Sequence, residues 1–416
     1  MISQPTLIEQ VNTSKNSAYL VIVFLLWPFI GLILACANFK DSLNKKIIIA
    51  FFSVYGLLFF INPLMDGQRR ADYFKVVHDQ PFENLFKTFD SLYDESLDVV
   101  DTTIMFIVSR VTDFHGILFA VYAFIFGLFM LNYISKMYEH YRINPTVNAM
   151  LFFILLICIN PISNINGFRM WMAAWVFAVG VMQYLHKPDK VFIVLAASSI
   201  LIHFSFVPAF AIFLVYIIFK NKALIYGVLA VITFFIAELN IEQVKVYASY
   251  LGSASETKVD SYTNEQHIEK VLEYGSQSAW YITFINNGLK YFTFLGLVII
   301  FYKTRGVFKN KITANFYSFS LLLLSFANIS ALLPSGGRFY TVFYIFAFSV
   351  LLLYYVYESE GKKISFINRF GIPIVALYAI FAFRLFSDSA SGYLFAPSFL
   401  MPFGLMENVS LKSLIF

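Results

Sequence analysis

The stretch that decides the fold is VFIVLAASSILIHFSFVPAFAIFLVYIIF, residues 191–219. A helix needs about 20 residues to cross roughly 30 Å of hydrocarbon, so this run is long for one span and short for two. One alternative is a single overlong helix. The other is a tight pair of short helices, or a re-entrant hairpin, that turns back between His203 and Pro208.

The composition of the whole chain is that of a membrane protein. Hydrophobic residues make up 59%, aromatic residues 19% and charged residues 13% of the sequence, outside the usual range for soluble proteins. Apolar runs of roughly 16 to 22 residues recur along the whole length. The expected fold is therefore all-α and polytopic, with about 12 transmembrane helices, at residues 18–37, 47–64, 117–134, 147–162, 168–186, 191–203, 205–219, 223–239, 281–302, 314–333, 338–357 and 370–386.

The distribution of charge favours the pair of short helices. Lysine and arginine concentrate in cytoplasmic loops, and here they gather in short loops at residues 40–46, 136–142, 187–190, 220–222, 303–311 and 362–369. All of these loops fall on one side only if residues 191–219 turn back on themselves. We therefore expect both termini to be external, together with longer external loops at 65–116 and 240–280 and an external tail at 387–416.

Two of the external regions contain expected helices. The segment SLDVVDTTIMFIVSRVTDFHG, residues 96–116, has the apolar spacing of an amphipathic helix lying at the membrane interface, with Val99, Ile104, Ile107, Val108 and Val111 as its apolar positions. The loop at 240–280 is polar and acidic, with a short helix expected around residues 264–274.

The first apolar run ends in ACA, which resembles the cleavage site of a signal peptide. The run is too long for the apolar region of a signal peptide, so we expect it to be retained as a helix.

Several classes of function lack their motifs. The chain has no Walker or G-x-G-x-x-G sequence, and no H-E-x-x-H, C-x-x-C, G-x-S-x-G or D-x-D pattern. Cys36 and Cys158 lie in separate apolar runs, which indicates neither a disulfide framework nor a metal pair. We expect no cofactor and no metal, and we expect any chemistry to take place on the external side.

Two arginines occupy unusual positions in so apolar a chain. Arg169 in NINGFR and Arg338 in LPSGGRFYTVF each follow a glycine-containing turn at the external start of a helix. Glycine lets a ligand approach the backbone, a helix N-terminus favours anions, and the guanidinium fork suits phosphate oxygens. Together the two arginines could hold a diphosphate. The plainer alternative is that each is an interfacial arginine that snorkels to the headgroups.

Other candidate site residues are a histidine and a charged segment. His203 lies at the proposed turn, where it could act as a general base, although a lone histidine among apolar residues is more often structural. In MDGQRRADYFKVVHD, residues 65–79, an aspartate could activate a sugar hydroxyl, Arg69 and Arg70 could contact phosphate, and Tyr73 could stack on a sugar. Asp66 and Asp72 are the acids concerned. The alternative is an ordinary solvated loop.

An ordered set of short motifs resembles the EpsG family, within the broader Wzy-type bacterial polysaccharide polymerases. The motifs are RRADYFKVV, SNINGFRMWMAAWVFAVGV, LIHFSFVPAF and SGGRFYTVFY, and the resemblance extends over most of the chain. Where such proteins often show Glu-Pro before the amphipathic segment, this chain has SLDVVD with Asp98 and Asp101. That departure leaves the role of an acid at this position open.

The resemblance implies glycosyl transfer at the external face of a bacterial inner membrane. A hydroxyl of one oligosaccharide repeat unit would attack the anomeric carbon of the growing chain, and undecaprenyl diphosphate would leave. Arg169 and Arg338 would hold the diphosphate, assisted by Arg69 or Arg70, with His203, Asp72 or Asp66 as base or orienting group. The implied partners are undecaprenyl-diphosphate-linked oligosaccharide, membrane lipids, a chain-length regulator and a repeat-unit flippase, and no nucleic acid.

Three rival functions remain open from sequence. A ligase that moves finished glycan onto another acceptor would use similar arginines. A flippase or transporter of lipid-linked sugars should carry charges near the midplane and show repeat symmetry, whereas the charges noted here lie at one face. A membrane acyltransferase should show a His-x4-Asp motif, which does not form around His203.

Overall fold

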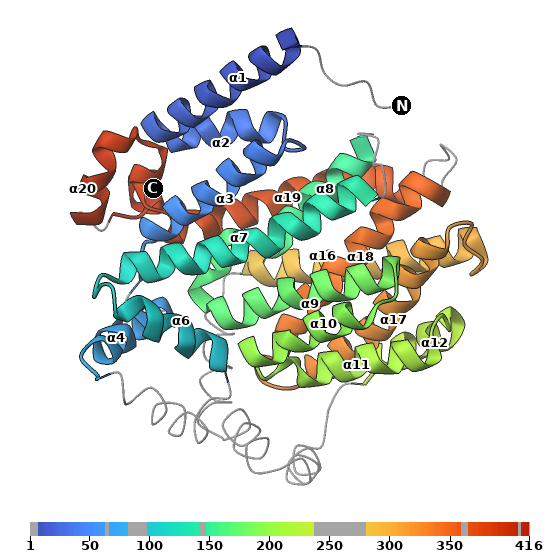
Figure 1. Ribbon diagram of the computed structural model, residues 1–416. Helices are drawn as coiled ribbons and strands as arrows, with labels where there is room; N and C mark the ends of the chain where they lie inside the picture. The colour runs from blue at the N-terminus through green and yellow to red at the C-terminus, as the bar shows by residue number, and fades with distance from the viewer. Residues whose placement is uncertain are drawn as a thin grey trace.

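The computed structural model describes residues 7–62, 66–81, 98–140, 147–236, 280–358, 365–406 and 409–415. Within these ranges the all-α prediction is confirmed, because the chain is helical and contains no strand beyond isolated bridges. The expected helix at 264–274 lies outside the described residues. Figure 1 shows the arrangement, and the longer helices are α1 Leu7–Leu26, α2 Pro28–Ala37, α3 Ser42–Leu57, α4 Asp66–His78, α6 Val99–Ser109, α7 His115–His140, α8 Val147–Ile159, α9 Phe168–His186, α10 Lys190–Ile202, α11 Phe206–Phe219, α12 Ala223–Phe234, α16 Trp280–Thr304, α17 Lys311–Ser330, α18 Phe339–Leu353 and α19 Ser365–Ser389.

The chain is a multi-pass membrane protein. Among the described residues, 6 helical stretches are long and apolar enough to cross a bilayer, namely His115–Glu139, Met150–His186, Trp280–Thr304, Lys311–Ser330, Gly336–Glu358 and Arg369–Ser389. Shorter apolar helices accompany them, including α10, α11 and α12. The predicted pair at 191–219 is confirmed, because α10 ends at Ile202 and α11 begins at Phe206.

One expected span is broken in two. The run predicted as a single helix over 18–37 is interrupted at Trp27, whose backbone is extended with φ −152° and ψ 86°. The physical reason is Pro28, because proline pushes the preceding residue out of the helical region and is itself favoured at the first position of a helix. The result is two helices, α1 and α2, in place of one.

Two helices at the core fix the position of the site. α9 and α18 carry buried side chains on nearly every face, as expected for helices that are surrounded by others. Against α9 lies α10, at a distance that only glycine permits. A Cβ on Gly180 would lie 2.5 Å from the backbone nitrogen of Ala196. This close packing fixes the start of α9, with Arg169, relative to the end of α10, with His203.

A group of short elements covers one end of the bundle. In Figure 1, α4 and α6 lie together beside the ends of α7 and α9. A 3-10 turn, η1 at Ile162–Gly167, leads into α9 at the same end. Residues 66–78, which sequence treated as a charged loop, form the helix α4. The helix expected near 96–116 is present as α6, and with α4 it brings charged side chains to the start of α9.

The C-terminal segment packs against the first helices. Here η4 is Gly392–Phe395, η5 is Ser398–Leu400 and α20 is Met401–Met406. The indole nitrogen of Trp27 donates to the carbonyl of Phe395 over 2.8 Å, and the ring of Phe29 lies 4.6 Å from that of Phe395. The tail expected at 387–416 is therefore tied to α1 and α2 through residues 395–398, where the Ser398 hydroxyl also donates to the carbonyl of Leu25.

Candidate functional site

Two buried aspartates lie at the centre of the site. Asp98 precedes α6 and Asp101 lies in its first turn, and each is only 1% exposed. Burying a carboxylate is costly unless it is paired and hydrogen-bonded. Both acids are therefore expected to have cationic partners, and the structure supplies these from α4, α9 and the α10–α11 turn.

Asp98 is surrounded by hydrogen-bond donors. Its Oδ2 accepts from Nη1 of Arg169 at 2.6 Å and lies 3.0 Å from Nδ1 of His203. Its Oδ1 accepts from the backbone N–H of Phe204 at 2.9 Å. An ionised carboxylate can only accept hydrogen bonds, so Nδ1 of His203 carries the proton. One acid thus ties α6, α9 and the α10–α11 turn together.

Asp101 joins the remaining elements. Its carboxylate forms an ion pair with Arg70 of α4, and its Oδ1 accepts from the hydroxyl of Tyr122 on α7 at 2.5 Å. Arg169, which pairs with Asp98, also approaches Asp101, because its Nε lies 3.9 Å from Oδ2 of Asp101. We refer to Asp98, Asp101, Arg70, Arg169 and His203 as the Asp–Arg cluster.

Local packing sets the register between α4 and α9. The side chain of Asn166, in η1, accepts from the backbone N–H of Gly67 at 2.9 Å. A Cβ on Gly67 would lie 2.7 Å from that same Asn166 oxygen, so a larger residue at position 67 would push this side chain away and weaken the hydrogen bond. Arg70 follows three residues after Gly67, and Arg169 three residues after Asn166. The hydrogen bond between Gly67 and Asn166 therefore helps to place Arg70 and Arg169 beside the two aspartates.

The other end of α4 is held by Arg110 at the end of α6. Its guanidinium donates over 2.5 Å to the carbonyl oxygens of both Val77 and Gln80, and it lies 4.4 Å from the ring centroid of Phe106. A cation that binds the last carbonyls of a helix stabilises its C-terminus. Both ends of α4 are thus fixed to the elements that carry the cluster.

The cluster holds its charges at neutral pH. Burial alone would raise the pKa of Asp98, but the hydrogen bond and charge of His203, the charge of Arg169 and the Phe204 amide outweigh it and lower that pKa to about 2. Burial, followed by the charge of Arg169, lowers the pKa of Arg70 to about 10. Asp98 is therefore a carboxylate at pH 7 and Arg70 a guanidinium.

The arginines of the cluster open onto a small cavity. This cavity, which we call the arginine cavity, has a volume of about 220 Å³ and is lined by Asp66, Arg69, Arg70, Tyr73 and Arg169. The side chains of Arg70 and Arg169 are 20% and 31% exposed, whereas the aspartates behind them are almost fully buried. The ion pairs with the aspartates use Nη1 of Arg70 and Nη1 and Nε of Arg169, and both side chains also line the cavity. Guanidinium groups at a cavity wall are suited to bind an anion.

The structure brings most of the residues predicted from sequence into this cavity. Arg169, Arg70, Arg69, Asp66 and Tyr73 line it, and Arg69 forms an ion pair with Asp66. Arg169 has two carboxylate neighbours, which an arginine that only snorkels to the headgroups would lack. His203 lies behind the cavity wall on Asp98, in a supporting position.

Two predicted residues lie elsewhere. Asp72 is exposed, does not line the arginine cavity and accepts from the side chain of Gln68 at 2.8 Å. Arg338 is exposed at the start of α18 and has no ion pair with any residue that the structure describes. Its neighbour Phe339 packs on Phe206 with ring centroids 5.7 Å apart. The start of α18 thus lies near the α10–α11 turn, outside the arginine cavity.

Asp98 and Asp101 are the residues to which sequence reasoning gave no role. The available signal was that both acids lie in SLDVVD, where the rest of the helix is apolar. In α6 the buried face includes Asp101, while the apolar side chains of Val99 and Ile107 are exposed. The acids therefore face the protein, and the exposed apolar side chains suit contact with lipid.

Comparison with known proteins identifies the family. The model of the EpsG family matches residues 80–398, which is well over half of the 416-residue chain. The chain belongs to the EpsG family. EpsG proteins are of the Wzy-like polysaccharide polymerase type. Neither the curated proteins nor the solved structures give a significant match.

The EpsG match includes only part of the site. Asp98, Asp101, Arg169, His203 and Arg338 fall within the matched residues, whereas α4 ends before them. Arg70 and the rest of the α4 contribution to the arginine cavity therefore come from outside the matched segment. Among the described residues of this EpsG protein, no group of three or more His, Cys, Asp or Glu side chains could hold a metal ion.

Proposed function

We propose that this EpsG-family protein is a membrane glycosyltransferase that polymerises oligosaccharide repeat units carried on undecaprenyl diphosphate, at the external face of the membrane. The observation that carries the proposal is the arginine cavity, in which Arg70 and Arg169 are held by the buried aspartates and present N–H groups to an anion. The lipid diphosphate is the anion proposed to bind there.

The reaction places the greatest demand on the leaving group. A hydroxyl of the acceptor repeat unit forms a bond to the anomeric carbon of the donor glycan, the bond from that carbon to the diphosphate breaks, and undecaprenyl diphosphate leaves with its negative charge. Fixed cations near the developing charge contribute strongly to catalysis. Arg169 and Arg70 are suited to this role because their ion pairs with the aspartates fix them before substrate binds.

The remaining residues have supporting roles in this proposal. Asp66 is the acid that lines the arginine cavity, so it is the candidate base for the acceptor hydroxyl, while Tyr73 can stack on a sugar. His203 is a positioning residue, because it holds Asp98, which in turn holds Arg169. Asp72 and Arg338 lie outside the cavity and receive no role in the transfer step.

Elongation of a defined substrate tests the function directly. Purified protein in nanodiscs is given an undecaprenyl-diphosphate-linked repeat unit with EDTA present, and products are separated on a gel. A ladder of products, accompanied by release of undecaprenyl diphosphate, is the expected result. Transfer of a preformed glycan onto a non-carrier acceptor without a ladder would indicate a ligase. Movement of the unchanged lipid across the bilayer would indicate a flippase.

A further inference from the structure

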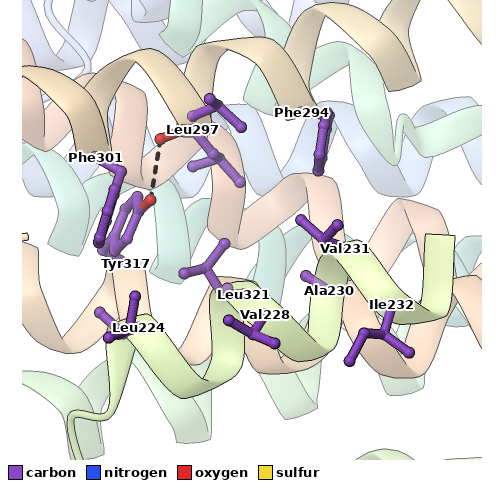
Figure 2. Close-up of a pocket in the computed structure, with 13 residues that line it drawn as sticks. Leu224, Val228, Ala230, Val231, Ile232, Phe294, Leu297, Phe301, Tyr317 and Leu321 are labelled. Atoms are coloured by element: carbon purple, nitrogen blue, oxygen red, sulfur yellow. Dashed lines mark hydrogen bonds between the residues drawn. The ribbon is translucent and has the colours of Figure 1, made fainter.

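The outer helices carry a second feature that the arginine cavity does not use. A groove of about 340 Å³ runs between α12 and α16, with α17 as its floor, and only apolar and aromatic residues line it (Figure 2). Figure 2 shows Tyr317 and Leu321 of α17 between the side chains of the two outer helices. Several lining residues are more than 40% exposed, so the groove opens toward lipid.

One face of α16 leads from this groove to a lysine. The groove residues Phe294, Leu297, Val298 and Phe301 follow Lys290 at spacings of four, seven, eight and eleven residues, which is one face of a helix. Lys290 therefore lies about one turn, roughly 5.4 Å, beyond Phe294. The ring of Phe294 stacks on that of Phe234 with centroids 5.3 Å apart. This pair lies between the groove and the lysine.

The ammonium group of Lys290 is surrounded by rings and not by acids. Its Nζ lies 5.0 Å from the ring centroid of Phe234 and 4.8 Å from that of Tyr340. No carboxylate pairs with it among the residues that the structure describes. A charged side chain within a spanning helix is costly and commonly marks a binding site for a charged ligand. The cation–π contacts hold the lysine in place, and none of the described residues neutralises its charge.

We infer that the α12–α16 groove, together with Lys290, binds the polyprenyl phosphate part of a lipid-linked substrate, a site separate from the arginine cavity. Lys290 takes the phosphate, and the apolar groove, which begins about one helical turn away, takes the isoprene units nearest to it. This inference rests on the proposed function, because joining two repeat units requires two lipid-linked substrates. The arginine cavity binds one carrier diphosphate, and the Lys290 site binds the other.

The two sites lie at the same end of the helices. Tyr340, which contacts Lys290, follows directly after Phe339, which packs on Phe206 in the first turn of α11. The α10–α11 turn carries His203 on its other side, in contact with Asp98. The start of α18 thus separates the Lys290 site from the Asp–Arg cluster, which suits two substrates whose sugars meet between them.

Photo-cross-linking tests the site independently of catalysis. The probe is undecaprenyl phosphate with a benzophenone on the isoprene units nearest the phosphate, in phosphatidylcholine nanodiscs, and cross-linked peptides are identified by mass spectrometry. Wild-type protein is expected to cross-link in α12 and α16. Lys290→Gln should lower that yield about tenfold, since a charge-assisted contact to phosphate is lost. Lys303→Gln, at the far end of the same helix, is the matched control and should leave the yield unchanged.

A second variant blocks the chain instead of the phosphate. A Cβ on Gly227 would meet only Leu321 at 3.8 Å, so Gly227→Leu is accommodated while its side chain fills the groove. The yield should again fall about tenfold, because the chain loses its apolar contacts. Gly288→Leu is the control, since a Cβ there meets none of the described residues within 4 Å.

The outcomes separate this inference from the proposed function. Arg169→Ala should lose elongation and keep the wild-type cross-link. If wild-type protein cross-links in α12 and α16 but makes no ladder, the result supports lipid binding in the groove and contradicts the polymerase proposal. Unchanged yields in both Lys290→Gln and Gly227→Leu would overturn the inference. Loss of the cross-link when excess phosphatidylglycerol is added would also overturn it, because the groove would then be a general site for anionic lipid.

Discussion

Arginine and lysine side chains at one end of the membrane domain have two kinds of surroundings. In the Asp–Arg cluster, Arg70 and Arg169 are each paired with a buried carboxylate. At the start of α18 and in α16, Arg338 and Lys290 have no carboxylate partner among the described residues. A paired cation is fixed before any ligand arrives, whereas a cation without a carboxylate partner contributes little to folding and remains available to a ligand.

Removing Arg169 should have the largest effect. Arg169→Ala deletes a fixed donor at the site of developing charge, so we expect kcat/KM for elongation to fall by about 10² to 10³. Arg338→Ala should change it by less than about tenfold, since Arg338 lies outside the arginine cavity. Single-turnover elongation in nanodiscs measures both. An equal loss of kcat/KM in Arg169→Ala and Arg338→Ala would show that pairing with a buried carboxylate does not decide which arginine matters for elongation.

The same contrast should appear in stability. Asp98→Asn leaves Arg169 and His203 without their shared carboxylate, and we expect the free energy of unfolding to fall by about 3 kcal/mol. Among the contacts that the structure describes, Lys290→Gln loses those with the rings of Phe234 and Tyr340, and it should cost about 1 kcal/mol or less. Titration with a denaturing detergent, followed by tryptophan fluorescence, compares the two. A larger loss in Lys290→Gln would mean that the lysine, not the aspartate, is the structural charge.

The stability supplied by Asp98 should depend on pH in a defined direction. Folding lowers its pKa to about 2, so the stabilisation is fully present above the unfolded pKa near ~3.9 and is lost as pH falls toward about 2. It is worth about 2 kcal/mol at neutral pH. The difference in unfolding free energy between wild type and Asp98→Asn should not decrease from pH 7 to 5 and should shrink below about pH 4. A difference that already shrinks between pH 7 and 5 would contradict the assignment of an ionised, paired Asp98.

A change that leaves every charge in place should have a smaller effect than the loss of Arg169 or Asp98. Gly67→Ala adds a Cβ 2.7 Å from the Asn166 oxygen, so the Asn166 side chain must shift, and the hydrogen bond that positions α4 and Arg70 is weakened. We expect stability to fall by about 1 kcal/mol and elongation by about tenfold. Gly337→Ala meets none of the described residues within 4 Å and serves as the control. Wild-type elongation by Gly67→Ala would show that the position of α4 does not matter to the site.

Much of the fold followed from the sequence because hydrophobic length and loop charge are strong signals. The pair α10 and α11 was expected from the positions of basic loops, and the start of α9 at Phe168 was expected from the glycine turn before it. The break at Trp27 was missed because a run of apolar residues masks the local effect of Pro28. Helix α4 was missed because its mixed charges resemble those of a solvated loop.

Sequence reasoning singled out the arginines that line the arginine cavity, but it gave no role to the aspartates that pair with them. Arg169 could be recognised by its position after a glycine turn, and Arg70 by its place in RRADYF. Asp98 and Asp101 could not be assigned, because which face of α6 turns inward depends on tertiary packing. Pairing Arg169 with Arg338 rested on their similar turns, whereas the contact of Asn166 with Gly67 places Arg169 beside Arg70. Contacts between segments far apart in sequence decided the outcome.

Binding of a short lipid diphosphate tests the central claim most directly. Geranyl diphosphate presents the anion with a chain short enough to stay in solution, and isothermal titration in nanodiscs measures its affinity against geraniol as the uncharged control. The account predicts that wild-type protein binds the diphosphate and not geraniol, and that Arg169→Ala binds it at least about tenfold more weakly. Equal affinity of wild type and Arg169→Ala for geranyl diphosphate would contradict the account.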